Sequence, residues 1–309
     1  MFLRKGPFQV LAVMLSIAGA FGPSPRAFAQ NPQPLVSETT LKKVSAHVWV
    51  LMGFPNIGIV VGNRATLVID TGLGERNGAT VVRVAQKLAS TPILYLTTTH
   101  FHPEHAAGLQ AFPPNTVLIR PIVQQEELEK LGEGMIDRFR SMSEQNKELL
   151  QDVKLRPPDI LFDTELKLDL GGVTARLFWL GPAHTKGDEL IYVEEDSVLL
   201  PGDIVQDKLI PNLSNEDASA KSWIEDLDKL EPLHPRLIVP DHGNLGDSSL
   251  IAQVKSFLTD LLNSTLDLKR QGKSADEAAE IVAAQFKTKY PDWKGNAVAN
   301  DVHRIYAEP

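Results

Sequence analysis

The stretch that decides the fold is His100-Phe101-His102-Pro103-Glu104-His105, which follows the apolar run Ile93-Leu94-Tyr95-Leu96 after three threonines. The apolar run is typical of a buried β-strand. In an extended or tight loop, positions i and i+2 point to the same side, so His100 and His102 can grip one metal ion. Glu104 and His105 then turn toward a neighbouring position. Imidazole and carboxylate ligands without sulfur suit zinc, and also iron or manganese.

Three further segments place ligand-type side chains directly after predicted strands. His184 follows the predicted strand 173–180, Asp203 follows the buried run 197–200, and Asp241-His242-Gly243 follows 237–239. Catalytic residues tend to gather on loops at one end of a sheet scaffold. We therefore expect the four loops to converge, because a purely structural role would require a separate explanation for each ligand-type residue.

The remainder of the chain alternates strand and helix patterns in both halves. Further strands are predicted at residues 48–51, 58–61, 65–69, 166–170 and 189–193. Helices are predicted over residues 80–89, 123–153 and 220–230, and from about 248 to the end in at least two segments around Gly272. This alternation indicates an α/β fold with sheets covered by helices.

Composition excludes several classes of protein. The chain has 309 residues, of which 43% are hydrophobic, and its formal charge is −8, which disfavours a nucleic-acid binder. It contains no cysteine, which excludes disulfides, thiolate metal ligands and a cysteine nucleophile. The serine motif Gly-x-Ser-x-Gly is also absent. We expect a small-molecule substrate and no nucleic-acid partner, whereas the pattern leaves the oligomeric state open.

The N-terminal residues resemble an export signal. Arg4 and Lys5 precede an apolar run over about residues 10–21, and Ala27-Phe28-Ala29 has the form of a cleavage site. We interpret residues 1–29 as a signal peptide and 30–40 as a short leader. The apolar run is too short to span a bilayer comfortably. We therefore expect no stable membrane insertion after cleavage, and a periplasmic location in a cell with two membranes.

Taken together, the motifs resemble those of the metallo-β-lactamase superfamily of metal-dependent hydrolases. The matching segments, in the family's order, are residues 69–72, 99–105, 184–188, 202–203 and 241–243. The resemblance implies an α/β fold of the αββα four-layer sandwich type, with the metal site along one edge of the two sheets. It places this domain at residues 41–250, which leaves residues 251–309 as a C-terminal helical extension packed on the domain.

The resemblance also implies a set of ligands for two zinc ions per chain. The first ion would be held by His100, His102 and His184, and the second by Glu104, His105 and His242. Asp203 would bridge the two ions. Asp70 would brace the histidine loop from behind, and Asp188 and Asp241 would support the loops rather than bind metal.

Glu104 departs from the family pattern. The family motif is His-x-His-x-Asp-His, and this chain has glutamate at the aspartate position. Glutamate is one methylene longer, so its carboxylate either binds metal from a shifted position or weakens the second site. In the family this carboxylate also orients the attacking water. The catalytic residues implied here are Glu104 and Asp203.

The activity implied is water attack on an ester, lactone or amide through a hydroxide activated by two metal ions. Hydrolysis of β-lactams is one candidate. The alternatives are a non-hydrolytic metal-binding or redox protein of the same fold, and a phosphodiester or sulfate ester hydrolase. Residues 54–56 lie where relatives carry a flap over the substrate, and Lys186 is a candidate contact for an anionic substrate. His47, His234 and His303 lack a surrounding motif, and we interpret them as structural.

Overall fold

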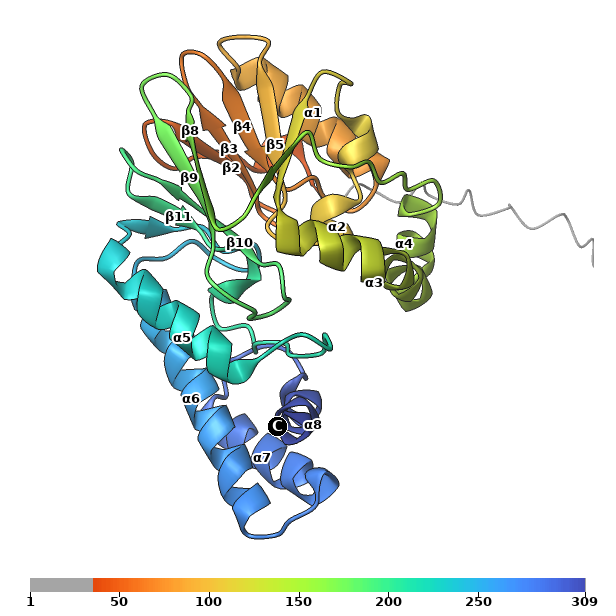
Figure 1. The fold of residues 1–309 in the computed structure, drawn as a ribbon, viewed down its shortest axis with the longest axis vertical. Coiled ribbons are helices and arrows are strands. Elements are labelled where there is room, and N and C mark those ends of the chain that lie inside the picture. Colours follow the sequence, from red (N-terminus) through yellow and green to blue (C-terminus); the bar gives the residue numbers. More distant parts are fainter. Residues whose placement is uncertain (1–35, 309) are drawn as a thin grey trace, which may run out of the picture. The chain divides into compact units, whose positions relative to one another are not determined.

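The computed structural model describes residues 36–308, so the predicted signal peptide and most of the predicted leader lie outside the described residues. Two β-sheets form the centre of this part of the chain (Figure 1). The first sheet runs in chain order, with antiparallel pairs up to β4 and parallel pairs from β4 onward. Its strands are β1 (Leu41–Lys43), β2 (Val48–Leu51), β3 (Ile57–Val61), β4 (Thr66–Ile69), β5 (Leu94–Thr97), β6 (Val117–Pro121) and β7 (Ile160–Phe162).

The second sheet has the order β12-β11-β10-β9-β8, and its β11–β12 pair is parallel whereas the others are antiparallel. Its strands are β8 (Glu165–Asp169), β9 (Thr174–Trp179), β10 (Glu189–Val193), β11 (Val198–Leu200) and β12 (Leu237–Ile238). Because β9, β11 and β12 run in the same direction, their carboxyl ends meet at one edge of this sheet.

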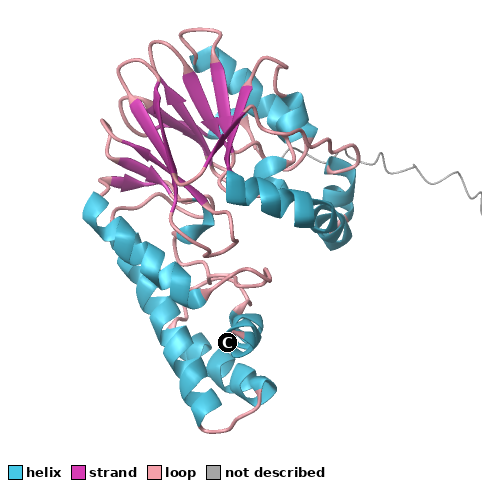
Figure 2. Ribbon diagram, viewed as in Figure 1, coloured by secondary structure: helices cyan, strands magenta, loops and turns pink. Residues whose placement is uncertain are grey.

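Helices lie on the outer faces of both sheets, as Figure 2 shows. Helix α1 covers the first sheet, and α5 and α6 lie along the second. The helices are α1 (Glu75–Leu88), α2 (Pro103–Ala106), α3 (Ile122–Met142), α4 (Glu144–Leu149), α5 (Ala220–Leu230), α6 (Ser249–Arg270), α7 (Ala275–Lys289) and α8 (Val298–Ala307).

The alternation of side chains along each strand explains these layers. In β4, Leu67 and Ile69 pack between the sheets, whereas Val68 faces α1. In β11, Val198 and Leu200 pack between the sheets, and Leu199 faces the helices on the other side. Both strands are therefore buried on both faces, as interior strands of a sheet covered by helices require. The predicted αββα sandwich is confirmed.

The structure also corrects the predicted elements. The helix predicted over 123–153 is two helices, because Ser143 ends α3 and its hydroxyl caps α4 by accepting a hydrogen bond from the Asn146 amide at 3.0 Å. Strands β6 and β7 were not predicted. Strand β6 contains Arg120, which is fully buried, and a buried guanidinium breaks the apolar pattern by which such strands are identified. Strand β7 has only three residues.

The C-terminal helices share one hydrophobic core with the second sheet. Trp223 of α5, Phe257 of α6, Val282 of α7 and Ile305 of α8 belong to the same buried cluster as Leu190 of β10. Helices α6 and α7 are separated at Gly272, whose φ of 78° favours glycine. Over residues 36–308, no helix combines the length and the apolar character needed to cross a membrane.

Asp301 ties helix α8 to the loop formed by residues 211–215. Its Oδ1 accepts a hydrogen bond from the Leu213 amide at 2.8 Å, and its Oδ2 has no partner among the described residues. Burial raises the pKa of the Asp301 carboxyl to about 8. The folded protein therefore binds the proton of this carboxyl more tightly than the unfolded chain does.

Asp301 should make the stability of the protein depend on pH. The stabilisation is largest below pH 4, where both states are protonated, and it is lost as the pH rises toward about 8. Asparagine does not titrate, so the free energy of unfolding of the wild type relative to Asp301→Asn should fall by at least about 1 kcal/mol between pH 5 and pH 8.5. Urea unfolding at both pH values measures this difference. The exposed control Asp152→Asn should show the same pH dependence of the free energy of unfolding as the wild type. If Asp301→Asn also showed the wild-type pH dependence, the raised pKa assigned to Asp301 would be contradicted.

Candidate metal centre

The loops that follow four strands bring the predicted ligands together. His100, His102, Glu104 and His105 follow β5, and His184 follows β9. Asp203 lies in the short 3₁₀ helix Gly202–Ile204 after β11, and His242 follows β12. All seven side chains are buried. The loop before Asp203 approaches the histidine loop closely, because a Cβ atom on Gly202, whose φ is 61°, would lie 2.9 Å from the Cβ of Thr99.

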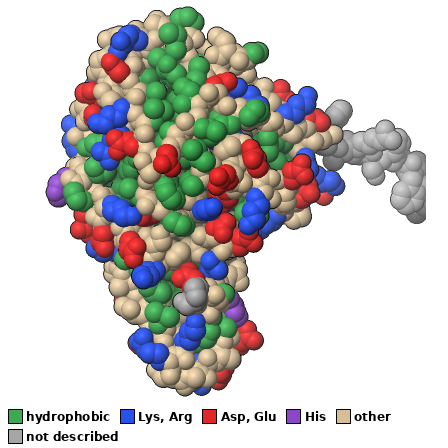
Figure 3. Space-filling model, in the orientation of Figure 1, with side chains coloured by type: hydrophobic (Ala, Val, Ile, Leu, Met, Phe, Trp, Pro, Cys, Tyr) green, Lys and Arg blue, Asp and Glu red, His purple; other side chains and the backbone are tan. Residues whose placement is uncertain are grey.

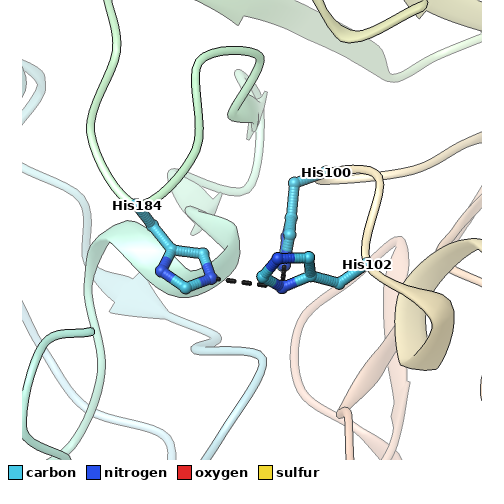
Figure 4. Close-up of side chains that lie close together, drawn as sticks. All are labelled: His100, His102 and His184. Carbon is cyan, nitrogen blue, oxygen red and sulfur yellow. Dashed lines mark hydrogen bonds between the residues drawn. The ribbon is translucent and has the colours of Figure 1, made fainter. Parts of the chain in front are cut away.

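Three histidines form one group of donors. His100 Nε2 lies 3.0 Å from His102 Nδ1, and His184 Nε2 lies 3.3 Å from the same nitrogen. Figure 4 shows that His184 approaches from a different loop and points toward the other two rings. The three nitrogen atoms lie close enough to share one ion.

A second group adjoins the first. Glu104, His105 and His242 place one donor atom each within 4.8 Å of one another. Asp203 lies between the two groups, because its Oδ2 is 3.5 Å from His184 Nε2 and its Oδ1 is 3.4 Å from His242 Nε2. Each oxygen of this carboxylate therefore faces a different group.

Asp70 and Asp241 support the histidine loop from behind. Asp70 Oδ1 accepts a hydrogen bond from the Thr99 amide at 2.7 Å, and its Oδ2 lies 2.9 Å from His105 Nδ1. The Thr99 hydroxyl donates to Asp241 Oδ2 at 2.8 Å. Asp188 accepts from the Thr185 amide and hydroxyl, both at 2.8 Å, and so shapes the His184 loop. These contacts match the supporting roles expected for the three aspartates, although Asp241 also lies near His100 and His105.

A loop from the second half of the chain orients two of the histidines, although no motif marks this loop as part of the site. His184 Nδ1 lies 2.8 Å from the carbonyl oxygen of Asn212, and His102 Nε2 lies 3.2 Å from Asn215 Oδ1. The Asn215 amide also donates to the His184 carbonyl at 2.9 Å. Such contacts to the second ring nitrogen fix which nitrogen can bind metal.

Burial keeps most of the imidazoles neutral. It lowers the pKa of His100 and His102 well below the usual value, and the neighbouring imidazoles add to the effect. Burial also lowers the pKa of His184, and that of His242 to about 4. A neutral imidazole keeps a lone pair for a metal ion, so these histidines are prepared for ligation.

The charged members of the site respond to one another. Burial raises the pKa of Glu104 to about 7. Burial opposes ionisation of Asp203, but His242 and His184 outweigh it and hold the pKa of Asp203 below its usual value. Burial likewise disfavours protonated His105, yet Asp70 and Asp241 raise its pKa well above the usual range. Of the five histidines among the predicted ligands, His105 is therefore the one whose protonated form is favoured, and Asp203 is the carboxylate whose ionised form is favoured.

Several buried atoms in this site have unmet bonding capacity. Among the described residues, Glu104 Oε2, His105 Nε2 and Asp203 Oδ1 have no hydrogen-bond partner. A buried polar atom without a partner costs free energy, and cations are the natural partners of carboxylate oxygens and imidazole lone pairs. The donor set thus fits a metal centre made of nitrogen and oxygen ligands.

A cavity of about 230 Å³ opens onto these ligands. Phe54 lies at its edge, with 53% of its surface exposed and its ring 4.0 Å from that of His242. Lys186 does not line the cavity and instead lies 4.0 Å from Glu126, whereas Arg138 of α3 does line it. The other histidines do not line it: His47 pairs with Asp196, His303 lies near Asp276, and His234 forms a turn.

Comparison with known proteins places this site in a family context. Residues 51–242, which include all seven predicted ligands, match the family model described as the metallo-β-lactamase superfamily. A metallo-β-lactamase type 2 from Bacteroides fragilis is 22% identical over 213 residues, which cover 67% of this chain and 76% of that protein.

Alkylsulfatases are similar as well. A linear primary-alkylsulfatase from Pseudomonas is 22% identical over 252 residues, covering 70% of this chain and 47% of that protein. The structure of a stereoselective inverting sec-alkylsulfatase from Pseudomonas superposes with a TM-score of 0.67 at 17% identity, covering 86% of this chain and 49% of that one. The chain thus spans about half the length of these alkylsulfatases.

Asn215 should control metal affinity without itself being a ligand. Replacing it with alanine removes the partner of His102 Nε2 and frees the ring to rotate. We expect Asn215→Ala to weaken metal binding about 10–100-fold. Competition with a chromophoric chelator measures the affinity, and the exposed Asn115→Ala serves as the control. An affinity equal to that of the wild type would show that the loop does not orient the site.

Proposed function

The chain belongs to the metallo-β-lactamase superfamily, whose members are metal-dependent hydrolases, and we propose that it uses two zinc ions to cleave a carboxylic ester, lactone or amide. One ion would be held by His100, His102 and His184, and the other by Glu104, His105 and His242. The zinc ions would supply Lewis-acid activation of water and of the bond to be cleaved. Hydrolysis of a β-lactam is one instance of this reaction.

The placement of Asp203 carries the proposal for two ions. A carboxylate that served a single ion would direct its oxygens to one group of histidines. Here one oxygen faces His184 and the other faces His242, at 3.5 and 3.4 Å. Two adjoining groups of donors that share one carboxylate are typical of two-metal hydrolytic sites.

The chain's own residues would perform the remaining tasks. We assign to Glu104 the orientation of the attacking water, because its Oε2 is buried and has no partner among the described residues. Asp203 would hold the two groups of ligands in a fixed relation to each other. The Phe54 ring covers one face of His242 and would exclude bulk water from this side of the cavity.

Sulfate ester hydrolysis is the second candidate. The match to the sec-alkylsulfatase covers 86% of the chain. Residues 1–248, which precede α6, make up a smaller share than this, so the match must include part of the C-terminal helical region. The segment 295–297 just before α8 lines the cavity. The match to part of the C-terminal helical region favours sulfate esters over phosphodiesters, the other alternative considered for this chain.

We also propose export to the periplasm, followed by cleavage after Ala29. The support is the order of charged residues, apolar run and Ala-Phe-Ala sequence within residues 1–29. Protein recovered from a periplasmic fraction would then begin at Gln30, which N-terminal sequencing measures. An intact N-terminus would contradict this proposal without affecting the assignment of the site.

Metal analysis combined with activity assays of this mature protein tests the function. We expect about two zinc ions per chain. Turnover of a p-nitrophenyl ester, a simple lactone or nitrocefin should be lost on chelation and return with zinc. Turnover of an alkyl sulfate alone would favour the second candidate. Bound iron with no hydrolysis of any of these substrates would contradict both candidates and favour a redox role.

Glu104→Asp tests whether the longer carboxylate is matched to this site. Shortening the side chain withdraws the carboxylate from His105, whose Nε2 now lies 3.9 Å from Glu104 Oε1. A displacement of about 1 Å can cost about 100-fold in rate, so we expect kcat to fall about 10–100-fold and zinc content to decrease. The exposed Glu126→Asp is the matched control. Unchanged zinc content and turnover would show that the extra methylene has no role.

A further inference from the structure

Helix α3 carries two stripes of side chains with different surroundings. The inner stripe packs into the protein and consists of Gln124, Glu127, Leu128, Gly132 and Ile136, all buried. The outer stripe consists of Met135, Arg138, Phe139 and Met142, which follow the i, i+3, i+4, i+7 spacing of one helix face. All four outer residues line the cavity above the predicted ligands. Phe139 also packs against the buried cluster that contains Leu149 and Leu150, whereas no such packing accounts for Arg138 and Met142, which are exposed.

The outer stripe is apolar except for one cation. Met142 is 55% exposed, and Phe139 lies with its ring 6.1 Å from that of His102. Phe54, Leu209 and Ile210 continue this apolar lining on other sides of the cavity. Methionine side chains adapt to ligands of varied shape, which suits a wall that contacts the apolar part of a substrate.

Arg138 is the one lysine or arginine among the described residues that line this cavity. Its guanidinium forms no ion pair or hydrogen bond with any described residue. Neighbouring cations on the same helix are paired, since Arg140 contacts Asp137 at 2.9 Å and Lys130 contacts Glu216. The acidic residues of the cavity, Glu104 and Asp203, face histidines rather than Arg138. The cation is thus available to an anionic ligand.

The cavity is also small. Its volume of about 230 Å³ is below the range of about 300–1,000 Å³ that is typical of sites for drug-sized ligands. A guanidinium binds carboxylate or sulfonate groups through paired hydrogen bonds, so a single anionic group is the chemistry that Arg138 would recognise.

We propose that this cavity selects small substrates with an apolar chain and one anionic group that is not itself cleaved. Arg138 binds the anionic group, the outer stripe of α3 and Phe54 hold the apolar chain, and the scissile group faces the predicted ligands. This inference rests on the proposed hydrolytic function and names the substrate class of the same site. Arg138 is a specificity residue and takes no part in bond cleavage.

Two esters of equal chain length test the proposal on the zinc-loaded enzyme. They are p-nitrophenyl pentanoate, which is neutral, and mono-p-nitrophenyl glutarate, which carries a terminal carboxylate. We expect the wild type to prefer the glutarate, and Arg138→Gln to lower its kcat/KM about tenfold or more. The value for the pentanoate should change less than about twofold, because its binding involves no charged hydrogen bond. The control Arg270→Gln removes an exposed cation of α6 that is paired with Asp267, and kcat/KM for both esters should stay at the wild-type value.

Equal losses for both esters in Arg138→Gln would overturn the proposal, and so would a wild type without preference for the glutarate. A binding measurement separates this failure from failure of the proposed function. Calorimetry with hexanesulfonate, which contains no cleavable bond, should show binding to the wild type that weakens about tenfold or more in Arg138→Gln. If neither ester is cleaved but this difference is found, the anion site stands and the hydrolytic assignment fails. Equal or absent binding in both proteins would overturn the anion site.

Discussion

The buried carboxylate of Asp70 joins the ends of two neighbouring parallel strands, and the position of the histidine loop depends on it. One oxygen accepts the Thr99 amide at the end of β5, and the other contacts His105. Asp70 itself has a φ of 71°, in the left-handed region that is costly for most residues and tolerated best by Asn and Asp. The strain is acceptable because the conformation aims the side chain across to the next strand. Through the Thr99 hydroxyl, the same network reaches Asp241 on the loop after β12 of the second sheet.

This arrangement explains why the sequence alone could predict that the loops with the metal-ligand residues converge. Each ligand loop begins where an apolar strand ends, and strands of one direction bring their carboxyl ends to one edge. The packing inside the sandwich can also be predicted from the sequence, because side chains alternate between the two faces of a strand, and this alternation assigns each side chain of β4 and β11 to a layer. A pattern that spans only a few residues therefore sufficed for most strands of the two sheets and for the meeting of the loops, but it missed β6 and β7.

Features that depend on contacts between distant segments were beyond sequence analysis. Asn215 supports His102 across 113 positions of the chain, and nothing in its neighbourhood marks it as part of the site. Arg138 belongs to a helix whose charged pattern is typical of a solvated surface, and only the packing of α3 brings it to the cavity. Lys186 illustrates the converse: its position beside His184 suggested a role, but its side chain turns toward Glu126. On the face in Figure 3, Lys and Arg are interspersed with Asp and Glu.

The inner and outer stripes of α3 differ in how well they should tolerate substitutions during evolution. Substitutions on the inner stripe disturb a packed layer, where most changes are costly. Met135 on the outer stripe is only partly buried and Arg138 and Met142 are exposed, and surface substitutions usually shift stability by less than about 0.5 kcal/mol. During evolution, substitutions of Met135, Arg138 or Met142 could therefore change the substrate specificity while the fold and the ligand loops stay unchanged. Helix α3 would then be the variable part of the site, and the ligand loops would be its constant part.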